Sequence, residues 1–505
     1  MAPTPSSLLR QEVDEALEAL ATFVVVKAHQ LMLQAVHTRA ACVGRSLQGS
    51  LSVPSQPQDL ALAVRNFQDA VDALAAFVTT FAKTDKFVFH LASMRRMYLD
   101  LYAISVKLDQ SGGVIGTEWQ KQLQLNRDKE EAELSARAAK NALPFARSMM
   151  PHEPMEALTL LKFEIDFFKP GNSVKHVASM KKVFFSVVRS SNGRVAKIPD
   201  WYIPPYAVNY SRDKVMPGSV GSAHRGVWID RKPADGKKPE RNEEGGEQEP
   251  TSYDVVVKRL LIHADAIELF RQEVEIWFNL DHPNILKLYG ASHCSRPALI
   301  VVTDASHGSL VEFLAGQWKF KSFDPRTMWS YFLQTAEGLK FLHGQKTVHG
   351  NLKSGNILVT TDGIVKLADF GRGMFALQSQ SLQNNKFHEL GWRAPNCLKD
   401  RKFPRRPAFQ DDIYSFGLCI LDALVPTVSS LSAAQGSNGP KRVGDESFDP
   451  LSPKVLDFIK DENAKKLVMD MCQPNPDARP TLGDVTKRMK ILAPRNPTIT
   501  GVVIA

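Results

Sequence analysis

The chain has 505 residues, of which 43% are apolar and 23% are charged, and its net charge is +9. This length predicts two or three domains, and this composition excludes a fibrous or wholly disordered chain. Five scattered cysteines without a CxxC pair argue against a disulfide framework and a zinc site. No apolar run approaches the roughly 18 residues of a membrane span, so we expect a cytoplasmic protein, with the membrane periphery as an alternative location.

Residues 1–148 have the pattern of an all-α helical bundle. Apolar side chains recur at steps of three and four residues in four segments, as from Val64 to Phe81. Breaker-rich stretches at 46–58 and 110–116 separate the segments. Four amphipathic helices with short connections predict an antiparallel bundle. No residue of the bundle looks catalytic, so we expect it to bind protein partners.

Residues 149–200 are predicted to connect the bundle to the rest of the chain. Their basic segment, 175–197, surrounds the apolar run VFFSVV with six cations, Lys175, Lys181, Lys182, Arg189, Arg194 and Lys197. Such a segment can lie on an anionic membrane surface. It can equally pack between two domains with its charges in water, and we favour packing because it is the commoner arrangement. The net charge permits a nucleic-acid partner without requiring one, and we expect none.

Nucleotide-binding features begin after residue 200. Residues 253–261 predict a strand that carries Lys258, whose ammonium group can hold phosphate oxygens. Glu273, on the helical stretch that follows, can fix the position of that lysine. A Lys and a Glu at this spacing are more often a simple surface ion pair, so the pair gains meaning only from the motifs that follow it.

Those motifs are a strand, a catalytic-type loop and a DFG triplet. Residues 298–310 predict a buried strand that runs into a polar turn, whose backbone can bond to an adenine edge. HGNLKSGN, residues 349–356, and VKLADFG, residues 365–371, follow at close range. Asn356 and Asp369 supply the oxygen ligands that Mg²⁺ prefers. The order and spacing are far more specific than any one motif.

Together these features resemble a eukaryotic protein kinase domain of the tyrosine-kinase-like group, over residues 201–494. The resemblance implies an α+β fold with a small β-rich N-lobe (201–305) and a helical C-lobe (306–494), preceded by the bundle. It implies ATP and Mg²⁺ as cofactors. Two polar segments, 230–252 and 428–447, are expected to be flexible insertions because they contain few apolar side chains.

The resemblance also implies the roles of individual residues. The metal ligands would be Asn356 and Asp369. The nucleotide would be bound by Gly218, Gly221, Ala223, Val256, Lys258, Glu273, Thr303, Asp304, Ala305 and Leu358. In the phosphate loop Met216 replaces the first of three glycines and Ala223 replaces a valine, so a plain β-hairpin is the alternative there. Because Val256 stands where the family has Ala, the volume above the adenine stays about constant.

The chain departs from the family at the catalytic loop. The triplet HRD is HGN, and Asn351 is neutral and cannot accept the proton that the family's Asp takes. Lys353, which resembles the lysine of Ser/Thr-type loops, is kept. Gly350 replaces an arginine that receives a phosphorylated loop, and in APN the side chain of Asn396 lacks the charge that would pair with Arg479.

Other family positions are kept. The four positions of the regulatory spine and the aspartate beneath them are occupied by Leu288, Trp277, His349, Phe370 and Asp412. HGN also resembles the pseudokinase domains of the Janus kinases. The whole arrangement is similar to that of the mixed-lineage kinase domain-like family, in which the bundle engages lipids and the pseudokinase restrains it; for the bundle this similarity is architectural only.

Three hypotheses follow from the sequence. The first is an ATP-binding pseudokinase that acts in signalling as a conformational switch or scaffold. The second is an active, atypical Ser/Thr kinase, in which another acidic group such as Asp304 replaces the missing base. The third is a membrane-surface or scaffolding protein that acts through its bundle. The substrate, the oligomeric state and the upstream signal do not follow from the sequence.

Overall fold

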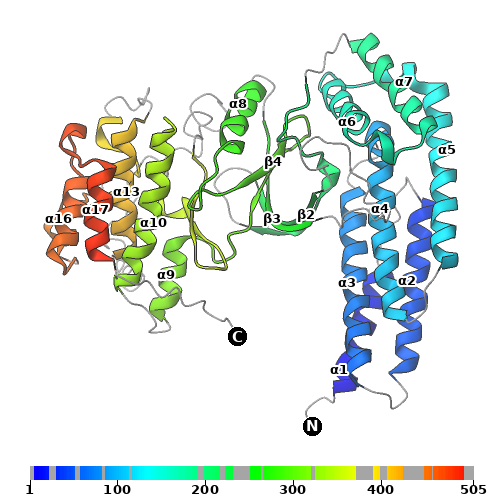
Figure 1. Ribbon diagram of the computed structural model, residues 1–505, viewed down its shortest axis with the longest axis horizontal. Coiled ribbons are helices and arrows are strands. Elements are labelled where there is room, and N and C mark those ends of the chain that lie inside the picture. The colour runs from blue at the N-terminus through cyan, green and yellow to red at the C-terminus, as the bar shows by residue number, and fades with distance from the viewer. Residues whose placement is uncertain are drawn as a thin grey trace, which may run out of the picture. The chain divides into compact units, whose positions relative to one another are not determined.

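The computed structural model describes most of the chain (Figure 1). The described residues are 5–21, 30–51, 57–81, 86–112, 117–191, 197–216, 222–230, 251–262, 266–319, 325–370, 391–397, 407–424, 449–457 and 459–493. By its internal contacts the chain divides into two units. The first contains residues 1–217, 222–260 and 294–300, and the second contains 218–221, 261–293 and 301–505.

The first unit begins with long helices. Their bounds are α1 (Pro5–Ala21), α2 (Gln30–Ser50), α3 (Pro57–Phe81), α4 (Phe87–Gly112) and α5 (Thr117–Arg147). The described residues up to 147 thus contain five helices, one more than predicted. The additional helix is α2, whose buried face includes Ala40 and Gly44 and therefore gives a weak apolar pattern. A Cβ atom at Gly44 would lie 2.7 Å from atoms of Leu17 and Phe67, so glycine allows the helices to approach closely there.

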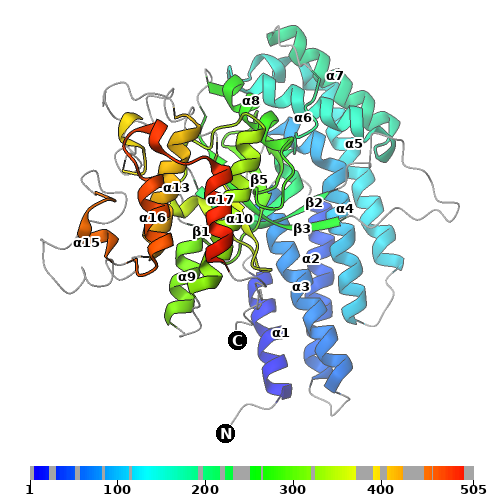
Figure 2. The same ribbon diagram turned by 60° about the vertical axis from the view of Figure 1, so that its left-hand side comes forward.

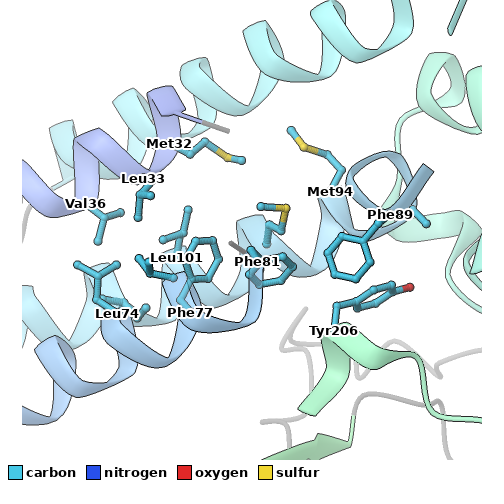
Figure 3. Packing of buried hydrophobic residues seen from close by; sticks show 14 of the residues in the cluster. Met32, Leu33, Val36, Leu74, Phe77, Phe81, Phe89, Met94, Leu101 and Tyr206 are labelled. Atoms are coloured by element: carbon cyan, nitrogen blue, oxygen red, sulfur yellow. The ribbon is translucent and has the colours of Figure 1, made fainter. Parts of the chain in front are cut away.

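The core of these helices is aliphatic and aromatic (Figure 3). Phe77 and Phe81 of α3 are buried with ring centroids 4.6 Å apart, and Phe89 of α4 lies 6.1 Å from Phe81. Phe81 belongs to the stripe predicted from Val64 to Phe81, and Phe77 and Phe89 are further aromatic residues of the same core. Two further helices, α6 (Glu153–Phe167) and α7 (Val174–Ser191), pack on α4 and α5, with the short 3-10 helix η1 (Lys169–Gly171) between them.

An aromatic segment follows α7 and is buried within the same unit. Trp201, Tyr202 and Tyr206 are each no more than 2% exposed. The ring of Tyr202 lies 5.3 Å from that of Phe163 on α6, and the ring of Tyr206 lies 5.8 Å from that of Phe89 (Figure 3). The predicted domain boundary at residue 200 therefore precedes a segment that belongs to the core of the helical region.

The strands are β1 (Val208–Met216), β2 (Ser222–Asp230), β3 (Thr251–Leu260), β4 (Leu288–Ser292) and β5 (Ala298–Thr303). They form one sheet in the order β1-β2-β3-β5-β4, with β1–β2 and β2–β3 antiparallel. Val255, Val256 and Val257 explain β3, because β-branched side chains favour strands. The predicted insertion 230–252 connects β2 to β3; its residues 231–250 lie outside the described residues.

The second unit is mainly helical (Figure 2). Its helices are α8 (Ile267–Phe278), α9 (Leu310–Lys319), α10 (Pro325–Gly344), α13 (Phe409–Leu424), α15 (Pro453–Leu456), α16 (Glu462–Met471) and α17 (Leu482–Leu492). A two-stranded sheet, β6 (Ile357–Val359) and β7 (Val365–Leu367), packs beside α9 and α10. Nearly every residue of α13 is buried, so this helix forms the centre of the unit. The predicted insertion 428–447 lies outside the described residues.

We find no membrane-spanning candidate among the helices of the described ranges, since none combines the required length with the required apolar character.

Candidate functional site

The predicted catalytic loop is fixed to α13 by one buried carboxylate. The backbone N–H groups of His349 and Gly350 each donate to Asp412 across 2.8 Å. The ring Nε2 of His343, at the end of α10, lies 2.8 Å from the same carboxylate. Asp412 is 1% exposed, and because a buried carboxylate needs such partners, its contacts hold the start of the loop against the helical core.

Gly350 adopts a backbone conformation that suits glycine. Its φ angle is +70°, in the left-handed region. An added Cβ would meet its nearest heavy atom, in Pro407, at 3.8 Å, so space alone does not require glycine. A residue with a side chain would be strained at this φ angle, so glycine suits the conformation that the loop has in this protein.

The three polar positions of the loop converge. Nδ2 of Asn356 donates to the backbone carbonyl of Asn351 across 2.7 Å, and the backbone carbonyl of Asn356 accepts from the N–H of Ala368 at 2.9 Å. Nδ2 of Asn351 lies 3.5 Å from the carbonyl oxygen of Asp369. Asn351, Asn356 and Asp369 are thus brought together in the structure, and their roles in metal binding and catalysis stay predictions. Lys353, half-buried, belongs to the same turn, and its carbonyl accepts from the N–H of Asn356 at 2.9 Å.

The spine positions of this unit are buried and in part stacked. The Trp277 and Phe370 rings lie 5.1 Å apart, and Phe370 lies 6.1 Å from His349, both edge to face. Leu288 on β4 is fully buried. Burial lowers the pKa of the His349 imidazole below its usual value. Its Nδ1 accepts from the N–H of Asn351 at 3.3 Å, so the neutral ring carries its proton on Nε2.

The segment at the end of β5 that contains Thr303, Asp304 and Ala305, which we call the hinge, lies beside β6, which carries the predicted nucleotide-binding residue Leu358. Backbone hydrogen bonds join the segment after β5 to β6, from His307 N–H to the carbonyl of Val359 at 3.2 Å and from Val359 N–H to that of Gly308 at 2.9 Å. Thr303 and Asp304 are half-buried and Ala305 is buried in this segment, and Leu358 is half-buried on β6. The contacts between the hinge and β6 were not predicted from the sequence, since they depend on pairing across about fifty residues.

The remaining nucleotide-binding positions lie on the other strands. Ala223 on β2 is paired with Lys258 on β3, and Val256 is buried two residues before that lysine. Gly218 and Gly221 lie outside the described residues. Lys258 belongs to the first unit and Glu273, half-buried on α8, belongs to the second. Their predicted ion pair stays a prediction.

The buried Arg479 has a carboxylate partner that the sequence did not reveal. Its Nη2 donates to Oδ1 of Asn396 at 2.8 Å, so the amide is a partner despite its lack of charge. Its Nη1 lies 3.2 Å from Oδ1 of Asp411, which also accepts from Nδ2 of Asn396 at 2.8 Å. Three backbone carbonyls complete the set, those of Gln410, Gln473 and Pro474. Asp411 directly precedes Asp412, and only its tertiary contacts distinguish it as a partner of Arg479.

Residues 214–489 match the sequence model of the protein tyrosine and serine/threonine kinase family. The chain belongs to this family. Its antiparallel sheet, the helical part that follows and the preceding helices confirm the predicted α+β kinase fold with an all-α N-terminal region. Membership also supports a kinase domain that binds ATP, with Mg²⁺ as the family's usual companion ion.

Individual relatives are similar over the kinase domain. The chain is 26% identical over 255 residues to the cysteine-rich receptor-like protein kinase 27 of Arabidopsis thaliana, which covers 48% of this chain and 39% of the relative. It is 26% identical over 244 residues to an Aurora kinase of Schizosaccharomyces pombe, covering 48% and 64%. It is 28% identical over 263 residues to a probable inactive receptor kinase, RLK902, of Arabidopsis thaliana, covering 47% and 38%. The chain thus spans between about two fifths and two thirds of the length of these relatives.

Proposed function

We propose that this protein is an ATP-binding pseudokinase that acts in signalling by changing conformation. The observation that carries the proposal is Asn351 in the place of the catalytic base, beside kept metal-ligand positions. An amide cannot accept the proton of a substrate hydroxyl. Much of the acceleration of phosphoryl transfer comes from positioning and electrostatics. We therefore expect the loss of the base to lower the rate of phosphoryl transfer by about 10² to 10⁴ and to leave nucleotide binding intact.

The residues of the loop fit a Mg²⁺-bound nucleotide. The Nδ2 group of Asn356 is used in its bond to Asn351, which leaves the amide oxygen as the side chain's acceptor. With the carboxylate of Asp369 this provides two hard oxygen ligands, the type that Mg²⁺ takes. The ion would neutralise phosphate charge, and Lys258 would hold the phosphates. Thr303, Ala305 and Leu358 would contact the adenine.

A route by which such a pocket could act on the helical region is supported by contacts within the first unit. Glu164 on α6 is fully buried and accepts from Arg95 on α4. It also accepts from the hydroxyl of Tyr206 at 3.3 Å, two residues before β1. Thr80 on α3 donates to Asn209 on β1 at 3.0 Å. Because β1, β2 and β3 are paired, a shift of β3, which carries Lys258, would displace β1 and so change the contacts of this segment with α3, α4 and α6.

The alternative is an active Ser/Thr kinase with unusual chemistry. Lys353 and the DFG triplet favour it, and Asp304 or a substrate group would have to replace the base. Aurora kinase is among the relatives by name, and so is a probable inactive receptor kinase, so similarity does not decide between the two.

An assay of phosphate transfer from labelled ATP with Mg²⁺ distinguishes the pseudokinase from the active kinase. We expect the purified chain to be stabilised against heat by ATP, since a ligand of the native state raises the melting temperature. With a rate lowered by about 10² to 10⁴, label on a generic protein acceptor should stay at the background level of the assay, and Asn351→Asp should raise it above that level. Lys258→Met is the control. It should abolish the stabilisation by ATP and, in combination with Asn351→Asp, the transfer of label. Incorporation by the unchanged chain that disappears in Lys258→Met would establish the active kinase instead.

Cytoplasmic location and protein partners of the helical region belong to the same proposal. The protein partners are tested by isolating complexes of the full chain from cell extract with and without ATP. Partners whose recovery changes with ATP in the unchanged chain but not in Lys258→Met would support a nucleotide-controlled scaffold, and recovery that ignores both would contradict it.

A further inference from the structure

A small cavity, which we call the Arg96 cavity, lies within the first unit. Its wall includes residues of α4, α6, the aromatic segment after α7 and β2. Among the lining residues are Arg95, Arg96, Phe163, Phe168, Tyr206 and Trp228. The cavity is open on one side and has a volume of about 30 Å³. Because one water molecule needs about 10–15 Å³ of such volume, the cavity has room for a group of two or three non-hydrogen atoms.

The guanidinium group of Arg96 has donors that are not used. The residue is 2% exposed, and its Nε lies 2.8 Å from both carboxylate oxygens of Asp100, one turn further along α4. Nη2 is buried without a hydrogen-bond partner, and Nη1 donates to no group in the described part of the chain. A buried donor without an acceptor costs free energy. The planar fork of Arg96 therefore indicates an acceptor that the cavity would supply.

The charges around the cavity limit the kind of acceptor. Nε of Arg95 donates to Glu164 at 2.5 Å, and this carboxylate also accepts from Asn172 at 3.1 Å. Arg95 and Arg96 are thus balanced by Glu164 and Asp100, so the four groups together carry no net charge. Because an excess of buried charge is costly, the cavity favours an anion with one negative charge. A phosphate dianion would add more charge and would also be larger than the cavity.

We propose that the Arg96 cavity binds the carboxylate group of a small monocarboxylic acid. Nη1 and Nη2 of Arg96 would each donate to one carboxylate oxygen, because the guanidinium fork and a carboxylate have matching planar geometry. The short apolar chain of the acid would lie against aromatic rings of the wall, such as those of Phe163 and Trp228. This inference does not depend on nucleotide binding.

A bound acid would contact several parts of the first unit at once. The wall joins α4, α6 and the aromatic segment to β2, which is paired with the strand that carries Lys258. A ligand that binds only this arrangement stabilises it. The acid would therefore strengthen the packing of the helices against the sheet, and its concentration would set how firmly the two are joined.

The test is saturation-transfer NMR of the full chain with acetate, propionate and butyrate at constant ionic strength. We expect transfer from the protein to each acid, with up to about fourfold tighter binding for each added methylene group. Arg96→Lys keeps a positive charge beside Asp100 but removes the planar fork. It should weaken propionate binding by about tenfold, the factor that corresponds to one charge-assisted hydrogen bond.

Two further variants make the test specific to this cavity. Arg39→Lys is the matched control, because Arg39 of α2 is paired with Asp109 at 2.8 Å and does not line the cavity. This control should bind propionate as the unchanged chain does. Ala207→Val leaves both arginines in place and adds volume at the wall, so it should weaken binding at least as much as Arg96→Lys does. Circular dichroism of each variant verifies the fold.

Four outcomes would overturn the proposal. Without transfer from the unchanged chain to any of the acids, the cavity would belong to water. Equal weakening in Arg96→Lys and Arg39→Lys would show a general effect of substitution, and full binding by Ala207→Val would place the acid elsewhere. Displacement of propionate by an equal concentration of chloride or of inorganic phosphate would show a site that does not select carboxylates.

Discussion

Two buried arginines, one in each unit, are satisfied in different ways. In the described part of the chain Arg95 donates its hydrogen bonds to one carboxylate, Glu164, and its guanidinium carbon lies 3.8 Å from the centre of the Phe168 ring. Arg479 instead bonds to three backbone carbonyls, one amide and one carboxylate. The difference shows that a buried charge can depend on a single acidic side chain or can be shared among many acceptors.

The second arrangement protects against substitution. If a buried ion pair loses one partner, the uncompensated charge that stays behind causes most of the destabilisation. Arg479 would keep four acceptors after the loss of Asp411, whereas Arg95 would lose the carboxylate that satisfies it. We call these two sites of hydrogen bonding the Arg95 junction and the Arg479 junction. We expect the loss of a carboxylate to destabilise the protein more at the Arg95 junction than at the Arg479 junction.

The largest effect is expected for Glu164→Ala. It leaves the Arg95 guanidinium buried without its carboxylate and should lower the free energy of unfolding by about 3–5 kcal/mol. Urea unfolding followed by circular dichroism measures this loss. Glu133→Ala, at an exposed position of α5, is the control and should change stability by less than about 0.5 kcal/mol. A loss below 1 kcal/mol at Glu164 would remove the distinction between the two junctions.

The next effect is expected for Asp411→Asn, with a cost of about 2 kcal/mol, because the remaining acceptors of Arg479 limit the damage. Asn396 offers a rescue, since its amide contacts both Arg479 and Asp411. Asn396→Asp should be unfavourable alone, by placing two carboxylates together, and should restore stability in the Asp411→Asn background. Chemical unfolding of the four proteins forms a double-mutant cycle. Simple additivity would disprove the exchange of charge between the two positions.

A smaller effect is expected for Gly171→Ala. A Cβ at this position would lie 2.7 Å from Cδ of Arg95, so the arginine would have to move away from its carboxylate. We expect a cost of about 1–2 kcal/mol, typical of overpacking. Thermal unfolding of the two variants measures this cost. The control is Gly49→Ala on α2, where an added Cβ meets no heavy atom within 4 Å, and which should be neutral or slightly stabilising. Equal results for the two glycines would show that the Arg95 junction tolerates displacement.

The smallest effect is expected for Tyr206→Phe. Burial raises the pKa of the Tyr206 phenol well above its usual value, so the group is a neutral donor to Glu164. Its loss should cost about 0.5–1.5 kcal/mol, the contribution of one hydrogen bond. In the Glu164→Ala background the same change should cost less, and this difference, measured by urea unfolding, isolates the contact. An equal cost in both backgrounds would show that the effect of the hydroxyl does not depend on its contact with Glu164.

Much of the kinase-like site could be predicted because its residues are held by local spacing. The turn after His349 places Asn351 beside Asn356, and the antiparallel pair β6–β7 returns the chain so that Asp369 lies next to them. Two other features could not be predicted in the same way, because they join residues far apart in sequence. They are the hydrogen bonds between the hinge and β6, and the contact of Arg479 with the carboxylate of Asp411. The helix α2 was missed because small side chains on its buried face weaken the apolar period.

The burial of the aromatic segment after α7 has a consequence for any attempt to cut the chain. A fragment that starts at residue 201, where family resemblance alone places the border, would carry Trp201, Tyr202 and Tyr206 without the helices that cover them. Such a fragment would expose a hydrophobic aromatic surface to solvent and should aggregate during expression. Transfer of the kinase domain to another protein, in the laboratory or by recombination of genes, would therefore have to include α4 and α6 as well.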